Sequence, residues 1–199
     1  GHLIAEYAKE RRVFVPVAAM PRRVVNAFVA AEDQNFYTHV GVDPVALARA
    51  IVMNVVYYWR GRKLIGASTI TQQVAKNFLL TNEVSIERKI KEAILAFRIE
   101  RALPKDRILE LYLNEIYLGY GSYGVAAAAL NYFNKSLDEL TMAEAAYLAA
   151  LPKAPNNYHP IRKSRAAKAR RDWVIGRMLE EGFVDRDTAE LAKHAALRV

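Results

Sequence analysis

Helical spacing of apolar residues is the feature that most constrains the fold of this chain. No stretch alternates cleanly between apolar and polar residues with turn residues on both sides, which is the pattern of half-buried strands. Only residues 13–17 resemble a strand. With 9 Gly and 7 Pro in 199 residues, the chain has too few turn residues for a many-turned all-β sandwich. The sequence therefore predicts an all-α fold.

Start signals divide the chain into a series of expected helices. Asp43-Pro44 combines an N-cap residue with proline at the first helical position, and Thr141 with Glu144 has the spacing of a capping box. The helix expected after Ser85 has one apolar face, formed by Ile86, Ile90, Ala93, Ile94 and Phe97. The other expected helices cover about 21–34, 69–79, 106–118 with Asp106 as its cap, 164–182 with Ser164 as its cap, and a last one from 185 or 187.

Composition narrows the class of partner. The chain has 29 Lys+Arg and 21 Asp+Glu, and its net charge of +8 favours an anionic partner: phosphate, nucleic acid or a lipid surface. Cysteine is absent, which excludes disulfides, thiolate metal sites and cysteine nucleophiles. The most apolar run, residues 50–59, is much shorter than the ~20 residues of a membrane span.

Glu32 is the first candidate for chemistry. Val25, Phe28 and Val29 precede it at helical spacing, so the carboxylate stands at the end of an apolar stripe. Desolvation there raises a carboxyl pKa, as a general base or acid requires. The alternative is a carboxylate that simply reaches water at a helix end. His39, in the polar segment that follows, taken alone fits a structural histidine better than a catalyst.

Two further segments carry hydroxyl and charged residues. Residues 66–73 run from a glycine into an expected helix start, where backbone N–H groups and hydroxyls bind anions, although ordinary N-capping uses the same residue types. Arg88, Lys89 and Glu92 share one helical face beside the apolar one. They form either a phosphate-binding cluster or a solvated, salt-bridged surface.

Together these segments resemble the motifs of the peptidoglycan glycosyltransferases, as found in class A penicillin-binding proteins and their monofunctional relatives. The resemblance runs in family order over about 32–178, most of the chain. The five matching segments are Glu32-Asp33-x-x-Phe36-x-x-His39-x-Gly41, Gly66-x-Ser68-Thr69-Ile70-Thr71-Gln72-Gln73, Arg88-Lys89-x-x-Glu92, Lys105-Asp-Arg-Ile108-Leu109-Glu110-x-Tyr112-Leu113-Asn114-x-x-Tyr117-x-Gly119, and the looser Arg170-Arg171-x-x-Val174-x-x-x-Met178.

This resemblance implies a lysozyme-like all-α domain over 1–199, with a globular head and a smaller membrane-facing jaw at about 43–67. The family joins lipid II units: the 4-hydroxyl of GlcNAc attacks the anomeric carbon of MurNAc, undecaprenyl pyrophosphate leaves, and an α linkage becomes β-1,4. Full-length members carry an N-terminal membrane anchor, which implies the outer face of the bacterial inner membrane. A C-terminal transpeptidase domain occurs in the bifunctional members. Neither segment is expected within these 199 residues.

The resemblance also assigns roles to residues. Glu32 matches the catalytic base of the family, and Glu92 matches its second essential glutamate. A divalent cation (Mg²⁺ or Mn²⁺) at Glu92 is one further expectation. No organic cofactor is expected. The implied partners are lipid II, lipid-linked glycan, the membrane surface and other cell-wall synthesis proteins, without a specific nucleic acid. The implied substrate- and pyrophosphate-binding residues are Asp33, Phe36, His39, Lys63, Ser68, Thr69, Gln72, Gln73, Lys76, Arg88, Lys89, Asn114 and Tyr117.

Several alternatives stay open at this level. A lysozyme-like hydrolase or lytic transglycosylase also places a glutamate at a helix end, but it has no need for cations around a diphosphate. A basic helical module for lipid or nucleic acid explains the charge but not Glu32 and Glu92. The apolar helix at 43–59 fits either a membrane-contacting jaw or a buried core helix. The basic stretch 162–171 fits either anion binding or a solvated face.

Overall fold

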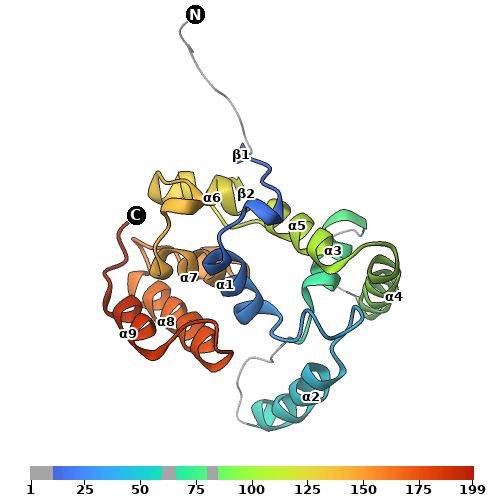
Figure 1. Ribbon diagram of the computed structural model, residues 1–199. Helices are drawn as coiled ribbons and strands as arrows, with labels where there is room; N and C mark the ends of the chain where they lie inside the picture. Colours follow the sequence, from blue (N-terminus) through green and yellow to red (C-terminus); the bar gives the residue numbers. More distant parts are fainter. Residues whose placement is uncertain (1–10, 60–65, 80–84) are drawn as a thin grey trace, which may run out of the picture. The chain divides into compact units, whose positions relative to one another are not determined.

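A computed structural model describes residues 11–59, 66–79 and 85–199 of the chain (Figure 1). In these ranges the only strands are β1 (Arg11–Arg12) and β2 (Ser122–Tyr123), which pair in parallel, while the other elements are helical. The all-α prediction is therefore confirmed. The chain divides into two compact units, which we call the discontinuous unit (Gly1–Ala31 with Leu113–Val199) and the inserted unit (Glu32–Tyr112). The predicted jaw at 43–67 lies inside the inserted unit.

The discontinuous unit is built around an alanine-rich helix. Its helices are α1 (Arg22–Glu32, whose last residue begins the inserted unit), α6 (Val125–Phe133), α7 (Met142–Ala150), α8 (Ser164–Glu180) and α9 (Arg186–His194), with short 3-10 turns η1 (Val17–Ala19), η2 (Leu137–Glu139) and η3 (Pro155–Asn157). Almost every residue of α7 is buried, and α8 packs against both α7 and α9 (Figure 1). Small alanine side chains permit this close approach of helices.

Arg171 of α8 connects this helix to the end of α9 through hydrogen bonds. Its side chain is fully buried, and its guanidinium donates to the carbonyl oxygens of Lys193 and Ala195 at 2.9 and 2.7 Å. It also pairs with Asp172 at 2.8 Å. Part of the basic stretch 162–171 is therefore structural. The Arg171 guanidinium does not face solvent, because it supplies hydrogen-bond donors to backbone carbonyl groups at the C-terminal end of α9.

The inserted unit contains α2 (Pro44–Trp59), α3 (Ile70–Leu79), α4 (Ile86–Ala102) and most of α5 (Lys105–Glu115). The helices α3 and α4 pack against each other. Buried within α4 are Glu92 and Ala96, whereas the apolar face identified in the sequence is exposed, with Ile86 at 83%. In α2 only Ala50 is buried, so the alternative of a buried core helix there is wrong.

The predicted helix starts are confirmed where a short polar side chain binds the first turn. Asp43 Oδ1 accepts from the N–H groups of Val45 and Ala46, and Ser85 and Asp185 cap α4 and α9. Two caps were wrong. Asp106 lies inside the first turn of α5, and Ser164 is the first residue of α8, whose N-cap is Lys163.

Candidate functional site

Glu32 and Gln73 meet in the inserted unit. Glu32 is half-buried at the end of α1, and its Oε2 accepts a hydrogen bond from Gln73 Nε2 at 2.9 Å. Gln73 lies in the first turn of α3, so two segments that are far apart in sequence converge on one carboxylate. An amide donor fixes the direction of the carboxylate oxygen that it binds.

Asp33, next to Glu32, is buried in a structural network. Its Oδ2 accepts from His39 Nε2 at 2.8 Å and from the backbone N–H of Ile70 at 2.9 Å. The N–H of Gly41 donates to His39 Nδ1 at 3.1 Å, so the ring carries its hydrogen on Nε2. The network therefore ties the segment after Glu32 to the start of α3.

The start of α3 is capped reciprocally. Gln72 N donates to Thr69 Oγ1 at 3.1 Å, and Thr69 N donates to Gln72 Oε1 at 3.0 Å, which is a capping box. Thr69 Oγ1 also donates to the carbonyl of Gly41 at 2.6 Å. The N-capping interpretation of this segment is thus confirmed for Thr69 and Gln72, both of which are buried.

Lys89 connects the second and third motifs. Its Nζ donates to Ser68 Oγ at 2.7 Å and forms an ion pair with Glu92. The Glu92 side chain is 2% exposed while that of Lys89 is 49% exposed. A buried carboxylate therefore holds an ammonium group whose outer part remains open to solvent and to an anion.

The other predicted cations occupy different settings. Arg88 is half-buried, and its Nε is buried without a hydrogen-bond partner among the described residues. Lys76 is exposed on the last turns of α3. Lys63 lies outside the described residues. Because this Nε is enclosed by protein atoms, a contact from Arg88 to a ligand would have to come from the rest of its guanidinium.

Phe36 is fully buried beside a charge network that the sequence analysis missed. Lys105 Nζ lies 4.7 Å from the centre of the Phe36 ring and donates to the His39 carbonyl and to Glu100 Oε1, each at 2.7 Å. Thr71 Oγ1 also donates to Glu100 Oε1 at 2.6 Å. No spacing rule signals this network, because Glu100 and Lys105 lie on either side of a helix break.

Tyr112 is a second residue that received no role from the sequence. Burial raises the pKa of its phenol well above the ordinary value of 10, and the carboxylates of Glu32 and Asp33 raise the pKa further. The side chain is 1% exposed. Tyr112 therefore remains a neutral phenol beside two carboxylates and adds no charge to the site.

Asn114 and Tyr117 belong to the discontinuous unit. The Asn114 amide exchanges two hydrogen bonds with the backbone of Val15, at 2.8 and 2.9 Å. Tyr117 is 41% exposed, and its ring lies 5.1 Å from that of Tyr123. Asn114 therefore fixes the N-terminal segment of its own unit, whereas Tyr117 presents an accessible ring.

The donors around Glu92 do not fit the expected divalent cation. The Glu92 carboxylate is already bound by the Lys89 ammonium. Across residues 11–59, 66–79 and 85–199, no three His, Cys, Asp or Glu side chains gather as a metal site. Hard divalent cations need several oxygen ligands, so no step proposed below passes through a metal.

No helix in the described ranges has the length and hydropathy of a membrane span.

Comparisons with known proteins identify the family of this chain. A family model described as Transglycosylase matches residues 1–179. Penicillin-binding protein 1A of Rickettsia felis is 58% identical over 192 residues, covering 96% of this chain and 24% of that protein. Its counterpart in Aquifex aeolicus is 51% identical over 199 residues, covering 100% and 27%, and the one in Escherichia coli K12 is 49% identical over 197 residues, covering 99% and 23%.

A crystal structure of penicillin-binding protein 1A from Haemophilus influenzae matches with a TM-score of 0.58 and 30% identity. The match covers 99% of this chain and 19% of that one. The chain thus spans about a quarter of the length of its curated relatives. The agreement of motifs, helical fold and relatives shows that the chain belongs to the transglycosylase family.

Proposed function

We propose that this chain polymerises peptidoglycan by transferring a growing glycan from undecaprenyl pyrophosphate to lipid II. The observation that carries the proposal is one unit that holds both a directed carboxylate, Glu32, and an accessible ammonium group, Lys89. An alcohol nucleophile needs a base, and a departing pyrophosphate needs positive charge. A glycan hydrolase needs the first but not the second.

In the proposed reaction, Glu32 accepts the proton of the GlcNAc 4-hydroxyl as that oxygen attacks the anomeric carbon of MurNAc. The bond from this carbon to pyrophosphate breaks, and its electron pair leaves with the pyrophosphate. Attack from the opposite face converts the α linkage into β-1,4. Gln73 supports this role because it keeps Glu32 Oε2 in one direction.

The leaving group is stabilised by cations rather than by a proton. Lys89 is positioned for this by Ser68 and Glu92, and Arg88 supplies a second positive charge on the same helix. A buried Glu92 acts as a positioning residue, because it orients the ammonium group without neutralising its exposed face. Lys76, Lys63, Asn114 and Tyr117 remain proposed contacts to substrate.

Exposed apolar helices support a membrane-bound substrate. Nine large apolar side chains of α2 are exposed, of which Trp59 at 84% and Tyr58 at 77% are the most exposed. The stripe of α4 adds Ile86 and Ile90. Aromatic and aliphatic residues of this kind favour the membrane interface. We therefore place the protein at the outer face of the bacterial inner membrane, anchored by a single span when full-length, beside other cell-wall synthesis proteins.

The experiment is lipid II turnover in detergent, read as glycan chains on a gel, with the variant Lys89→Gln. Loss of the ammonium group removes charge stabilisation that exists only as pyrophosphate leaves, so turnover falls about 100-fold. Lys91→Gln is the matched control, because Lys91 lies on the same helix, is 58% exposed and pairs with exposed Glu87. It keeps the wild-type rate within about twofold.

Wild-type polymerisation by Lys89→Gln would remove the leaving-group argument. Digestion of preformed glycan by the folded chain, without any lipid II polymer, would favour the lysozyme-like hydrolase instead. Both results are read against thermal unfolding of the same preparations, so that misfolding is recognised separately.

A further inference from the structure

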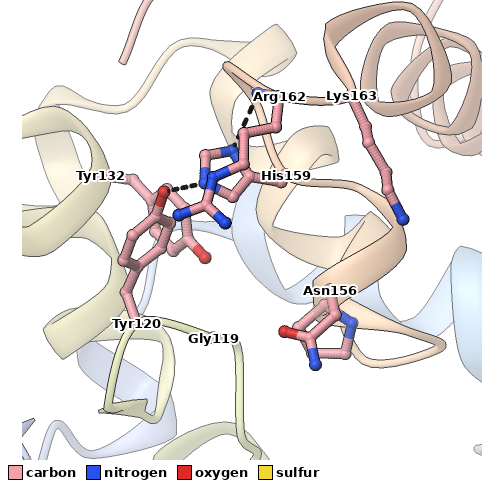
Figure 2. A pocket seen from close by; sticks show the side chains of 8 residues that line it. Gly119, Tyr120, Tyr132, Asn156, His159, Arg162 and Lys163 are labelled. Atoms are coloured by element: carbon pink, nitrogen blue, oxygen red, sulfur yellow. Dashed lines mark hydrogen bonds between the residues drawn. The ribbon is translucent and has the colours of Figure 1, made fainter.

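A pocket of about 370 Å³ lies entirely within the discontinuous unit and takes no part in the proposed reaction (Figure 2). It forms where the loop between β2 and α5 faces the segment from η3 to the start of α8. Its polar walls are Tyr120, Tyr132, Asn156, His159, Arg162 and Lys163. Its volume is in the range of pockets that bind small molecules.

The loop that presents Tyr120 is strained. Tyr120 has φ of 50°, between Gly119 at 91° and Gly121 at 68°. A non-glycine residue in this conformation is costly and persists only where its surroundings hold it. Here the Asn131 amide donates to the Tyr120 carbonyl at 3.0 Å. A Cβ at Gly119 would lie 2.7 Å from the Tyr132 hydroxyl, so this residue must be glycine for the loop to close.

His159 sets the direction of the Tyr120 hydroxyl. The backbone N–H groups of Ile161 and Arg162 donate to His159 Nδ1 at 3.2 and 3.1 Å, so the ring hydrogen is on Nε2. Nε2 then donates to the Tyr120 oxygen. Tyr120 keeps its own hydroxyl hydrogen available, and it therefore faces a ligand as a donor.

Two cations complete the wall. Figure 2 shows Arg162 reaching toward Tyr120, while Lys163 extends along the other side toward Asn156. In the part of the chain that the structure describes, neither cation has a carboxylate partner, and Lys163 Nζ contacts only Asn157 Oδ1 at 3.3 Å. No acidic residue lines the pocket. An anion is the ligand group that these donors favour.

We propose that this pocket binds a sugar-sized ligand that carries a carboxylate or phosphate group. The cations and the Tyr120 hydroxyl bind the anionic group. The Asn156 amide provides hydrogen bonds for ring hydroxyls, and the Tyr120 and Tyr132 rings, with centres 5.4 Å apart, form an aromatic wall against a sugar ring. A bare anion would leave most of this volume and both rings unused.

The test is calorimetric titration of the chain with four probes. These are N-acetylmuramic acid for a carboxylate, glucose 6-phosphate for a phosphate, neutral N-acetylglucosamine, and inorganic phosphate. We expect one of the two charged sugars to bind with a roughly millimolar Kd and the neutral sugar and bare phosphate at least about tenfold more weakly. The stronger charged sugar identifies the anionic group.

Variants locate the binding. Arg162→Gln weakens the charged sugar about tenfold, whereas Arg165→Gln, an exposed arginine that does not line the pocket, leaves its Kd unchanged. Tyr120→Phe, which keeps the ring, tests the hydroxyl donor, and thermal unfolding checks that each variant folds. Equal binding of charged and neutral sugar, equal binding of bare phosphate, absence of binding by both charged sugars, or insensitivity to Arg162→Gln would overturn the proposal.

Discussion

Asp33 and His39 illustrate how single residues stabilise the fold next to Glu32. Asp33 is 6% exposed, and His39 and the N–H of Ile70 are its donors. Burial of a carboxylate is tolerated only when its oxygens are bound. The buried carboxylate of Asp33 therefore depends on the His39 ring as a hydrogen-bond donor. The sequence pattern alone could not distinguish this structural role of His39 from substrate binding.

His39→Ala removes one donor from this buried carboxylate. We predict a loss of about 1–3 kcal/mol in the free energy of unfolding, measured by urea denaturation. His194→Ala is the control, because His194 is exposed and its ring hydrogen-bonds to the Glu190 carbonyl on its own helix. Unchanged stability in His39→Ala would show that Asp33 is satisfied without the ring.

At the scale of elements, α7 begins with a pH-dependent cap. Burial alone would raise the pKa of Glu144, but Lys135 at 2.8 Å and the Thr141 donors lower it below its ordinary value of 4.5. A lowered folded-state pKa means that this stabilisation is complete above about pH 4.5 and is lost as the pH falls through the folded-state pKa.

Glu144→Gln should therefore reduce the melting temperature at pH 7 and reduce it less at pH 3, because pH 3 lies below the ordinary carboxyl pKa of 4.5 and the stabilisation by the ionised carboxylate is already smaller there. Thermal unfolding at both pH values measures this difference. Glu180→Gln, at the exposed end of α8, serves as the comparison. A destabilisation by Glu144→Gln that is equal at both pH values would contradict the ion-pair explanation.

The sequence predicted elements best where local chemistry defines their start. The capping box of Thr141 was identified, and helices were expected after Ser85 and from 185 or 187, because a cap needs only one side chain and a nearby N–H. The helix α6 was missed, since its uniformly apolar alanine run has no helical period and follows three glycines. Periodicity also found the apolar stripe of α4 but could not show that this stripe is exposed, because that depends on tertiary packing.

In the candidate site, too, the sequence indicated residues that belong to local motifs and missed contacts that depend on tertiary packing. The motif residues of the inserted unit were proposed from the sequence, and the structure joins Glu32 to Gln73 and Ser68 to Lys89. Glu100 and the pocket around Tyr120 were not found, because their partners come together only through the fold.

At the scale of the whole molecule, the exposed face of α2 predicts membrane binding. Trp59→Gln should weaken binding to anionic lipid vesicles, measured by co-sedimentation, by several-fold without lowering the melting temperature, because Trp59 is 84% exposed. Trp173→Gln is the control, since its ring is covered on one side by Arg170 at 3.8 Å. Equal vesicle binding by both variants would contradict a membrane role for α2.

The central claim is that Glu32 is the base of a glycan polymerase, and Glu32→Gln tests it most directly. The variant keeps the side-chain volume and the melting temperature, and lipid II polymerisation falls at least about 100-fold, since general-base catalysis contributes that much. Glu87→Gln, an exposed glutamate of α4, stays active. Polymerisation at the wild-type rate by folded Glu32→Gln would contradict the account.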